Sequence, residues 1–395
     1  MDNPLAWLGE QIETWKRAGA YQTLRELQSA CAPVCRFDGR EVINLASNNY
    51  LGLTDHPKLI AAALEATRKY GVGSGAVRTI AGTMSIHLEL ERRIAAFKQV
   101  EACVVFQSGF AANAGTVAAI LTPEDHIVSD ESNHASIIDG CRLSKAKIHV
   151  FAHKDAASAE RILGELDNQP GRKLLVTDGV FSMDGDIAPL PALVAAARRH
   201  GAIMMIDDAH SSGVLGRNGR GTVDHFGLHG QVDIQVGTLS KAIGALGGYV
   251  CGSRELIEYL YHRARPFLFS TSHPPAVAAS CLAAFEVLEE EPERIENLWK
   301  NTRYFKAALG EAGFRTGASE TPITPILVGE AKTAHAFSRA LFEEGVFATG
   351  IGFPTVPEGK ARVRTIMTAT HTREHIDRAL EILSRVAKKT GILAN

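Results

Sequence analysis

The amino-acid sequence predicts an α/β protein whose mainly parallel sheet is covered by helices on both faces. From about residue 58 onward, short β-rich runs such as 102–106 (ACVVF) and 202–206 (AIMMI) alternate with helical patterns. Continuous apolar runs of strand length indicate strands that are buried on both faces, and their alternation with helices indicates parallel pairing. A chain of 395 residues is too long for one small core, so we expect a large and a small domain.

The predicted elements divide the chain into three parts. Residues 1–45 form an N-terminal arm, with a helix over about 5–30 and a hairpin that turns at Asp38-Gly39. Residues 46–285 form the large domain, and residues 286–395 form a small α/β C-terminal domain. In the large domain we predict strands at 102–106, 126–128, 174–177, 202–206, 234–236 and 248–250, and a long helix over about 276–288. The C-terminal domain carries predicted strands at 325–328 and 361–366 between helices.

The composition favours a soluble protein that acts on small molecules. Hydrophobic residues make up 45% of the chain, charged residues 22%, and the formal net charge is −2. Nothing in this balance favours nucleic acid or an anionic membrane surface as a partner. The N-terminal segment has no basic start followed by an apolar run, and no stretch approaches the roughly 18 apolar residues of a spanning helix. We therefore expect a cytoplasmic protein.

The six cysteines are scattered and contain no CxxC pair. Cys31 and Cys35 are separated by three residues, but no matching pair of cysteines or histidines follows them. We therefore expect reduced thiols and no metal site.

Polar residues cluster where the predicted strands end, which is where parallel sheets bind ligands. The segment 107–115 (QSGFAANAG) runs from a strand into a helix, so Gly109 and the first free amides favour a phosphate there. The glycine-rich segment 71–83 follows a helical pattern instead of a strand, which argues against a dinucleotide site.

Asp207, His210 and Lys241 together suit pyridoxal 5′-phosphate (PLP). Lys241 follows a Thr-Leu-Ser turn and precedes small residues, so its amine is desolvated and can hold the aldehyde as a Schiff base. Asp207 ends an apolar strand and can keep the pyridine nitrogen protonated, while His210 can donate to the phenolic oxygen. The hydroxyls of Thr238 and Ser240 are placed to meet the phosphate. Asp208 competes with Asp207, but alternation along a strand directs it to the opposite face.

Two further residues complete the candidate site. His134 precedes a predicted helix, where it either caps that helix or stacks on the flat cofactor. Ser182 lies on a loop rich in turn-forming residues, where its hydroxyl either approaches the cofactor or bonds its own backbone.

With these residues assembled, the chain from about residue 40 to 390 resembles the α-oxoamine synthases, PLP enzymes of fold type I that condense an amino acid with an acyl-CoA thioester. The motifs that carry the resemblance are SNNYLGL, GSGAVRTIAGT, SGFAAN, NHASIIDG, DGVFSMDGDIAPL, DDAH, GRG, GTLSKA, RPFLFSTS and ARVRT.

The resemblance implies a role for each matching position. Lys241 is the Schiff-base lysine and the base at the α-carbon, Asp207 pairs with the pyridinium, and His210 pairs with the phenolic oxygen. His134 stacks on the ring and Ser182 lies near it. The amides of Gly109 and Phe110 hold the phosphate together with Thr238.

The remaining implied roles concern substrates and a second subunit. Ser270 and Thr271 reach the phosphate of the neighbouring subunit's cofactor, which implies an obligate homodimer. Arg364 and Asn49 lie by the amino-acid carboxylate, for which a bidentate guanidinium is well suited. Arg25 matches an arginine near the acyl substrate.

The motifs leave two reactions open. Segments 133–146 and 353–365 are similar to the branch that joins glycine to acetyl-CoA and yields 2-amino-3-oxobutyrate, and we expect this reaction. SGFAAN and STSHPPA are equally similar to the branch that joins alanine to a pimeloyl thioester with loss of carbon dioxide. That reaction, or both activities together, is the alternative.

Overall fold

The computed structural model describes residues 3–17, 21 and 23–394 and divides the chain into two compact units. The larger unit comprises 49–182 and 186–296, and the smaller comprises 1–48, 183–185 and 297–395. The N-terminal arm that we expected as a separate part groups with the C-terminal residues. Its predicted helix is also shorter than expected, because α1 covers Ala6–Arg17 and the described residues from 23 to 30 are not helical.

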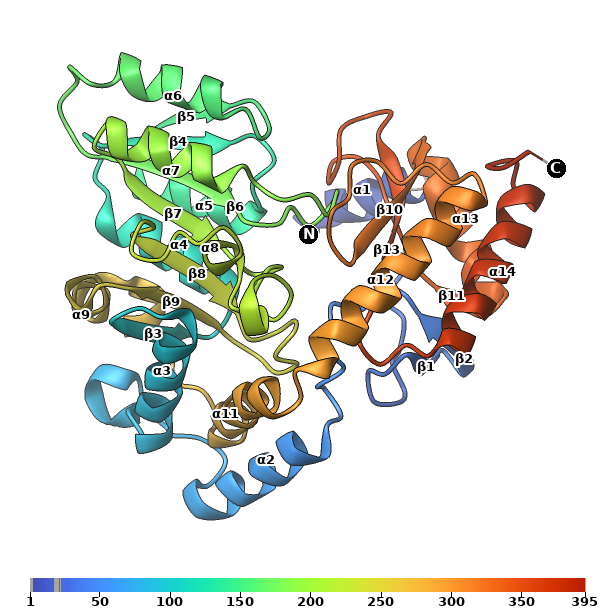
Figure 1. Cartoon of the computed structure of the whole chain (residues 1–395), viewed down its shortest axis with the longest axis horizontal. Coiled ribbons are helices and arrows are strands. Elements are labelled where there is room, and N and C mark those ends of the chain that lie inside the picture. The colour runs from blue at the N-terminus through green and yellow to red at the C-terminus, as the bar shows by residue number, and fades with distance from the viewer. Residues whose placement is uncertain (1–2, 18–20, 22, 395) are drawn as a thin grey trace. The chain divides into compact units, whose positions relative to one another are not determined.

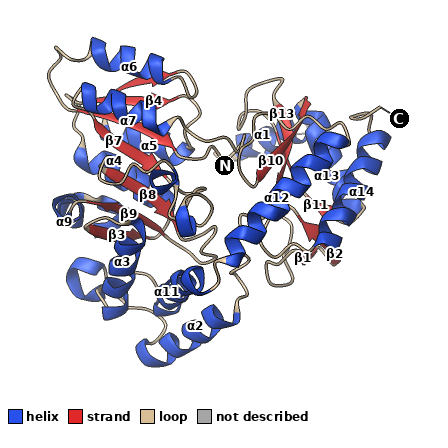
Figure 2. Ribbon diagram, viewed as in Figure 1, coloured by secondary structure: helices blue, strands red, loops and turns tan. Residues whose placement is uncertain are grey.

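A seven-stranded sheet forms the centre of the larger unit (Figures 1 and 2). Its order is β3-β9-β8-β7-β6-β4-β5, and the strands from β8 to β5 are parallel while β9 runs antiparallel to β3 and β8. The expected mainly parallel sheet is therefore confirmed. Its strands are β3 (Ala102–Phe106), β4 (His126–Asp130), β5 (Lys147–Phe151), β6 (Lys173–Asp178), β7 (Ile203–Asp207), β8 (Ile234–Thr238) and β9 (Gly248–Gly252).

Helices cover both faces of this sheet, because successive strand residues alternate between two hydrophobic clusters. On β6, Leu174 and Val176 pack with α4 (Gly109–Ile120), α5 (Ala135–Ser144) and α9 (Arg254–Arg263), whereas Leu175 packs with α6 (Ala156–Glu165) and α7 (Leu190–Arg199). The other helices of this unit are α2 (Pro57–Tyr70), α3 (Ser85–Lys98), α8 (Thr222–His225), α10 (Arg265–Leu268) and α11 (Pro275–Glu290), with a π-helical turn at Arg78–Gly82 and a 3₁₀ turn at Arg217–Gly219.

The smaller unit contains two three-stranded sheets. In one, β2 (Arg40–Asn44) lies between β1 (Val34–Phe37) and β11 (Val346–Phe347), and it pairs in parallel with β11. This pairing explains why the arm groups with the C-terminal residues. In the other sheet, β13 (Ala361–Ile366) lies between β10 (Ile323–Gly329) and β12 (Thr349–Ile351).

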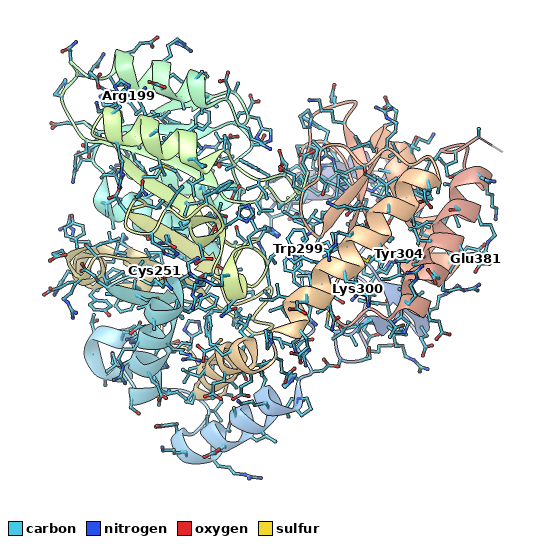
Figure 3. The ribbon with its side chains drawn as sticks, viewed as in Figure 1. Arg199, Cys251, Trp299, Lys300, Tyr304 and Glu381 are labelled. Carbon is cyan, nitrogen blue, oxygen red and sulfur yellow. The ribbon has the colours of Figure 1, made fainter. Side chains whose placement is uncertain are left out.

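Three helices pack on the sheets of the smaller unit: α12 (Glu293–Glu311, from Asn297 onward), α13 (Ala331–Glu343) and α14 (Arg373–Lys389). Tyr304, labelled on α12 in Figure 3, ties α12 to α14. Its hydroxyl donates to Asp377, and the Arg373 guanidinium lies 3.1 Å from the centre of its ring.

A buried ion pair fixes the backbone just beyond β7. The Lys98 ammonium donates to Asp208 Oδ2 at 2.6 Å and to the Arg220 carbonyl at 2.6 Å, and both charged side chains are fully buried. Gly221 is required beside this pair, because its φ is +101° and a Cβ there would lie 2.1 Å from Asp208 Oδ2. Asp208 thus points away from Asp207, as strand alternation predicts.

A second charged cluster anchors the loop that carries Ser182. His153 contacts Asp130 through Nδ1 at 3.1 Å and Asp186 through Nε2 at 3.0 Å, and its ring packs edge-on against Phe181. Burial opposes the charged ring, but the hydrogen bonds to both carboxylates raise the pKa of His153 to about 9. The imidazolium therefore ties the loop to the end of β4.

Among the described residues, no helix combines the length and apolar character that crossing a membrane requires.

We expect Lys98→Ala to lower the free energy of unfolding by about 3–5 kcal/mol, because it leaves Asp208 buried without its cation. Denaturant unfolding of the purified protein measures this change. Arg161→Ala, which removes an exposed pair with Glu165, is the matched control and should leave the unfolding midpoint unchanged. A loss below about 1 kcal/mol for Lys98→Ala would show that the pair is not a major stabilising contact.

We expect His153→Gln to destabilise the protein by about 2 kcal/mol near pH 6, because it removes a charged donor to two carboxylates. The pKa of the folded-state ring, about 9, lies above its ordinary value of 6.5. The stabilisation is therefore complete below about pH 6.5 and is lost as the pH rises through about 9. Denaturant unfolding of both proteins across this range tests the expectation. A difference that stays constant or grows with pH contradicts it.

Candidate active site

A cavity of about 140 Å³ in the larger unit lies where β6, β7 and β8 end, beside the start of α4. The predicted residues that line it come from five separate segments of the sequence. They are Gly109, Phe110, His134, Ser182, Asp207, His210, Thr238 and Lys241, and they are joined by Ser136, Asp178 and Ala209.

A larger hollow of about 750 Å³ lies at the opposite edge of the same sheet. Its lining includes Ile203 and Ile234 at the amino ends of β7 and β8, and it contains none of the predicted site residues. The predicted reactive side chains line the smaller cavity, which is therefore the candidate active site.

One side of the cavity is an anion site. Ser108 caps α4 by accepting the Ala111 amide, which leaves the amides of Gly109 and Phe110 at the positive end of a twelve-residue helix. A Cβ on Gly109 would lie only 3.3 Å from the Thr238 Cβ, so glycine lets these two segments approach closely. This arrangement fits a phosphate group.

Asp207 is held rigidly although it is almost completely buried. Its Oδ2 accepts from Asn113 Nδ2 at 2.6 Å, and its Oδ1 accepts from the Ala209 amide at 2.8 Å. Asn113 Nδ2 also donates to Ser136 Oγ at 2.9 Å. These bonds orient the carboxylate toward the cavity without neutralising it.

Asp178 is a second buried carboxyl group in the cavity. It lies directly opposite Asp207 in the β6–β7 register, and it accepts the His134 amide at 2.8 Å. Burial raises the pKa of Asp178 well above its usual range, and the negative charge of Asp207 adds to this effect. The carboxylate of Asp207 favours a cationic ligand in the cavity, and a protonated pyridine ring is such a ligand.

His134 caps a helix, which is one of the two alternatives that its sequence context left open. It caps α5, since its Nδ1 accepts the Ser136 amide, and the same nitrogen lies 2.7 Å from Ser136 Oγ. Its ring also lines the cavity. Burial lowers the pKa of His134; the charge of Asp207 opposes this shift and that of Lys241 adds to it. The ring is therefore neutral near neutral pH, as stacking against a cationic ring requires.

His210 is positioned by Tyr50, whose hydroxyl lies 2.7 Å from His210 Nδ1. Both side chains are buried, and their rings meet edge to face. The contact fixes the direction in which the imidazole faces the cavity.

Lys241 follows β8 on a tight turn that is closed by a hydrogen bond from the Gly244 amide to the Lys241 carbonyl. Thr238 Oγ1 donates to the Gly247 carbonyl at 2.7 Å and stays on the cavity wall. Ser240 does not line the cavity. Its hydroxyl instead contacts the backbone of Gly247, so only Thr238 of the two predicted hydroxyls faces the site.

The remaining predicted residues do not line this cavity. Asn49 belongs to the larger unit, where its side chain bonds Thr54 and the Leu53 amide. Ser270 and Thr271 follow α10, and Thr271 is exposed.

Arg25 and Arg364 belong to the smaller unit. Arg25 forms an ion pair with Asp38 at 2.8 Å, and its guanidinium lies 3.5 Å from the centre of the Phe342 ring. Arg364 lies on β13 opposite Thr349 and Pro325.

Asn113, Ser136 and Asp178 are cavity or network residues to which the sequence analysis assigned no role. Asn113 lies one helical turn beyond Gly109, and its polar side chain in a largely apolar helix was a usable signal. Asp178 ends its strand as Asp207 does, so the same rule applied to both. Ser136 carried no signal beyond its distance of two residues from His134.

Comparison with known proteins adds family information to this geometry. Residues 40–383 match the family described as aminotransferase class I and II. The chain is 62% identical over 387 residues to 8-amino-7-oxononanoate synthase from Symbiobacterium thermophilum. The matched region covers 98% of this chain and 99% of that protein. It is 55% identical over 393 residues to 8-amino-7-oxononanoate synthase 1 from Bacillus subtilis, with both chains covered completely.

Solved structures of related enzymes share the fold. A serine palmitoyltransferase from S. paucimobilis with bound PLP superimposes with a TM-score of 0.93 at 31% identity, covering 99% of this chain and 100% of that chain. An 8-amino-7-oxononanoate synthase from Francisella tularensis gives a TM-score of 0.75 at 29% identity, covering 88% of this chain and 98% of that one. The chain therefore belongs to the α-oxoamine synthases, within the class I and II aminotransferase family of PLP-dependent enzymes.

Proposed function

We propose that this enzyme condenses alanine with a pimeloyl thioester, releases carbon dioxide and yields 8-amino-7-oxononanoate. The observation that carries the proposal is the full-length similarity, at 55–62% identity, to proteins named for that product. The cavity supplies the functional groups that any member of this family needs, so the choice among members depends on the comparison.

The proposed reaction is the alternative of the two that the motifs left open, and not the one that we expected from them. Segments 133–146 and 353–365 favoured glycine and acetyl-CoA, but the relatives reported above carry the name of the alternative product. The motifs that we compared are short, and short motifs that related branches share are poor indicators of the acyl chain.

The residues of the cavity fit bound PLP on three sides. The amides of Gly109 and Phe110, with Thr238, bind the phosphate at the start of α4. Asp207 keeps a proton on the ring nitrogen, while Asn113 holds that carboxylate in place. When bound, PLP draws electrons from the α-carbon of an attached amino acid and makes its proton acidic.

Lys241 would hold the cofactor through its amine, and the same amine would supply the base that takes a proton from the α-carbon of the substrate. His134 would place its neutral ring against the cofactor, and His210 would donate to the phenolic oxygen.

We also propose that two copies of the chain complete each other's sites. Ser270 and Thr271 do not line the cavity of their own chain, and Thr271 is exposed. Family resemblance assigns both hydroxyls to the neighbouring subunit's phosphate.

A thiol-release assay tests the proposed reaction. We expect the purified, PLP-loaded enzyme to release CoA fastest from pimeloyl-CoA with alanine, together with one equivalent of carbon dioxide. Glycine should replace alanine poorly, and acetyl-, succinyl- and palmitoyl-CoA should react more slowly. Fastest turnover with glycine and acetyl-CoA, without release of carbon dioxide, would overturn the proposal.

Lys241→Ala is the control for this assay. It should reduce thiol release by at least about 10³-fold, because it removes both the covalent link and the base. It should also leave no cofactor attached to the protein after borohydride reduction. Lys173→Ala, which changes a lysine that pairs with Asp167 outside the cavity, should retain activity and the reducible link.

For the shared site, we expect the double variant Ser270→Ala/Thr271→Ala to bind PLP about tenfold more weakly, since it loses hydrogen bonds to a charged phosphate. Fluorescence titration of the PLP-free protein measures this affinity, and sedimentation equilibrium measures the mass of the assembly. Unchanged affinity, or an assembly with the mass of one chain, contradicts the shared site.

A further inference from the structure

Cys31 and Cys35 form a thiol pair in the smaller unit, at the start of the arm's hairpin. Asn44 Nδ2 lies 3.7 Å from Cys31 Sγ and 3.5 Å from Cys35 Sγ. A single amide donor thus faces both sulfurs. The active-site cavity uses none of these residues.

The surroundings of Cys35 stabilise a thiolate. The Ala32 amide donates to Cys35 Sγ at 3.2 Å, while the Ala32 carbonyl, at 3.0 Å, accepts the proton when Cys35 is a thiol. The hydrogen bond from Cys31, with those from Ala32 and Asn44, outweighs burial and lowers the pKa of Cys35 to about 6. The same pairing raises the pKa of Cys31.

The pair is open to small reagents on one side. Cys31 is partly exposed, whereas Cys35 is only 1% exposed. Cys31 Sγ also lies 3.1 Å from Ser47 Oγ, three residues beyond Asn44.

The other four cysteines are sealed in the larger unit. Cys251, labelled on β9 in Figure 3, lies opposite Cys103 on β3, and these thiols are 0% and 4% exposed. Burial raises the pKa of Cys103 well above its usual range and raises those of Cys141 and Cys281 to about 12. Proximity of two thiols alone therefore does not distinguish Cys31 and Cys35 from Cys103 and Cys251. The exposure of Cys31 does, because the other pair is closed to reagents.

We propose that Cys31 and Cys35 are a reversible redox-modification site that a hydroperoxide converts to an intramolecular disulfide. Both sulfurs lie within 3.7 Å of the same Asn44 nitrogen, so closing an S–S bond of about 2.05 Å needs only local movement. Neither the proposed condensation nor its cofactor takes part.

The reaction is balanced by the two thiols and one hydroperoxide. The proton of Cys31 moves to Cys35, and Cys31 Sγ, the exposed sulfur, attacks the peroxide O–O bond as a thiolate. The bond breaks to give a sulfenic acid and, from hydrogen peroxide, hydroxide, which takes the proton from Cys35 and leaves as water. The Cys35 thiolate then attacks the Cys31 sulfur, forms the S–S bond and expels hydroxide. The two sulfurs are oxidised together by two electrons, and the peroxide is reduced.

Peptide mapping of the PLP-loaded, full-length enzyme tests the site. The protein is treated with one equivalent of hydrogen peroxide, remaining thiols are blocked with N-ethylmaleimide, and trypsin releases residues 26–36 (ELQSACAPVCR), which contain both cysteines. We expect this peptide to lose about 2 Da, the mass of two hydrogens, and dithiothreitol to restore it. Two of the six thiols should be lost from the thiol count.

Two variants separate a specific site from general oxidation. Cys31→Ser should abolish the 2 Da loss, and Cys141→Ser, a change at a buried thiol outside the pair, should leave it unchanged. Disulfide formation in wild-type enzyme at a rate at least about tenfold above oxidation of the buried thiols supports the site. Irreversible oxidation of a single cysteine, or no reaction within the peptide, overturns it. Because the readout is mass, the outcome is independent of which substrates the enzyme condenses.

Discussion

The site depends on the way in which β7 ends, with two consecutive aspartates in a buried position. Because side chains alternate along a strand, Asp207 and Asp208 must point to opposite sides, and each buried carboxylate needs a partner of its own. Asp208 has an internal partner, the ammonium of Lys98. Asp207 accepts hydrogen bonds from two neutral donors, the Asn113 side-chain amide and the Ala209 backbone amide. One carboxylate thus holds the scaffold together, while the other keeps its charge available for a ligand.

The sequence predicted the buried parallel strands because continuous apolar runs leave little ambiguity about burial. It did not predict β5, whose residues KIHVF carry a lysine and a histidine and whose side chains are largely exposed at the sheet edge. The arm could not be assigned to its unit, because the partner of Ile43 on β2 is Val346, some three hundred residues away. The predicted helix over 5–30 was too long, since apolar residues persist beyond Arg17 without helical structure in the described residues.

Within the site, residues with distinctive chemistry could be predicted and their supports could not. The site residues Lys241, Asp207 and His210 lie at or just beyond the ends of strands. A lysine, an aspartate and a histidine in this order are an uncommon combination, so they were informative. Tyr50 and Asn113 act by holding His210 and Asp207, and both contacts join segments far apart in sequence. Asp208 was placed correctly by alternation alone, but Lys98 lies 110 residues away and left no local signal. The acyl chain was not predictable from short motifs that related branches share.

The order of strands in the large sheet also bears on how the chain acquires its structure during synthesis. β3 is the first of the seven strands to be made, but in the described sheet it pairs only with β9, through contacts such as Ala102 with Gly252. Its apolar residues, ACVVF, must therefore wait for about 150 residues of later chain before they find a hydrogen-bonding partner. A nascent chain that stops short of β9 carries an unpaired hydrophobic strand, the kind of segment that chaperones shield from aggregation.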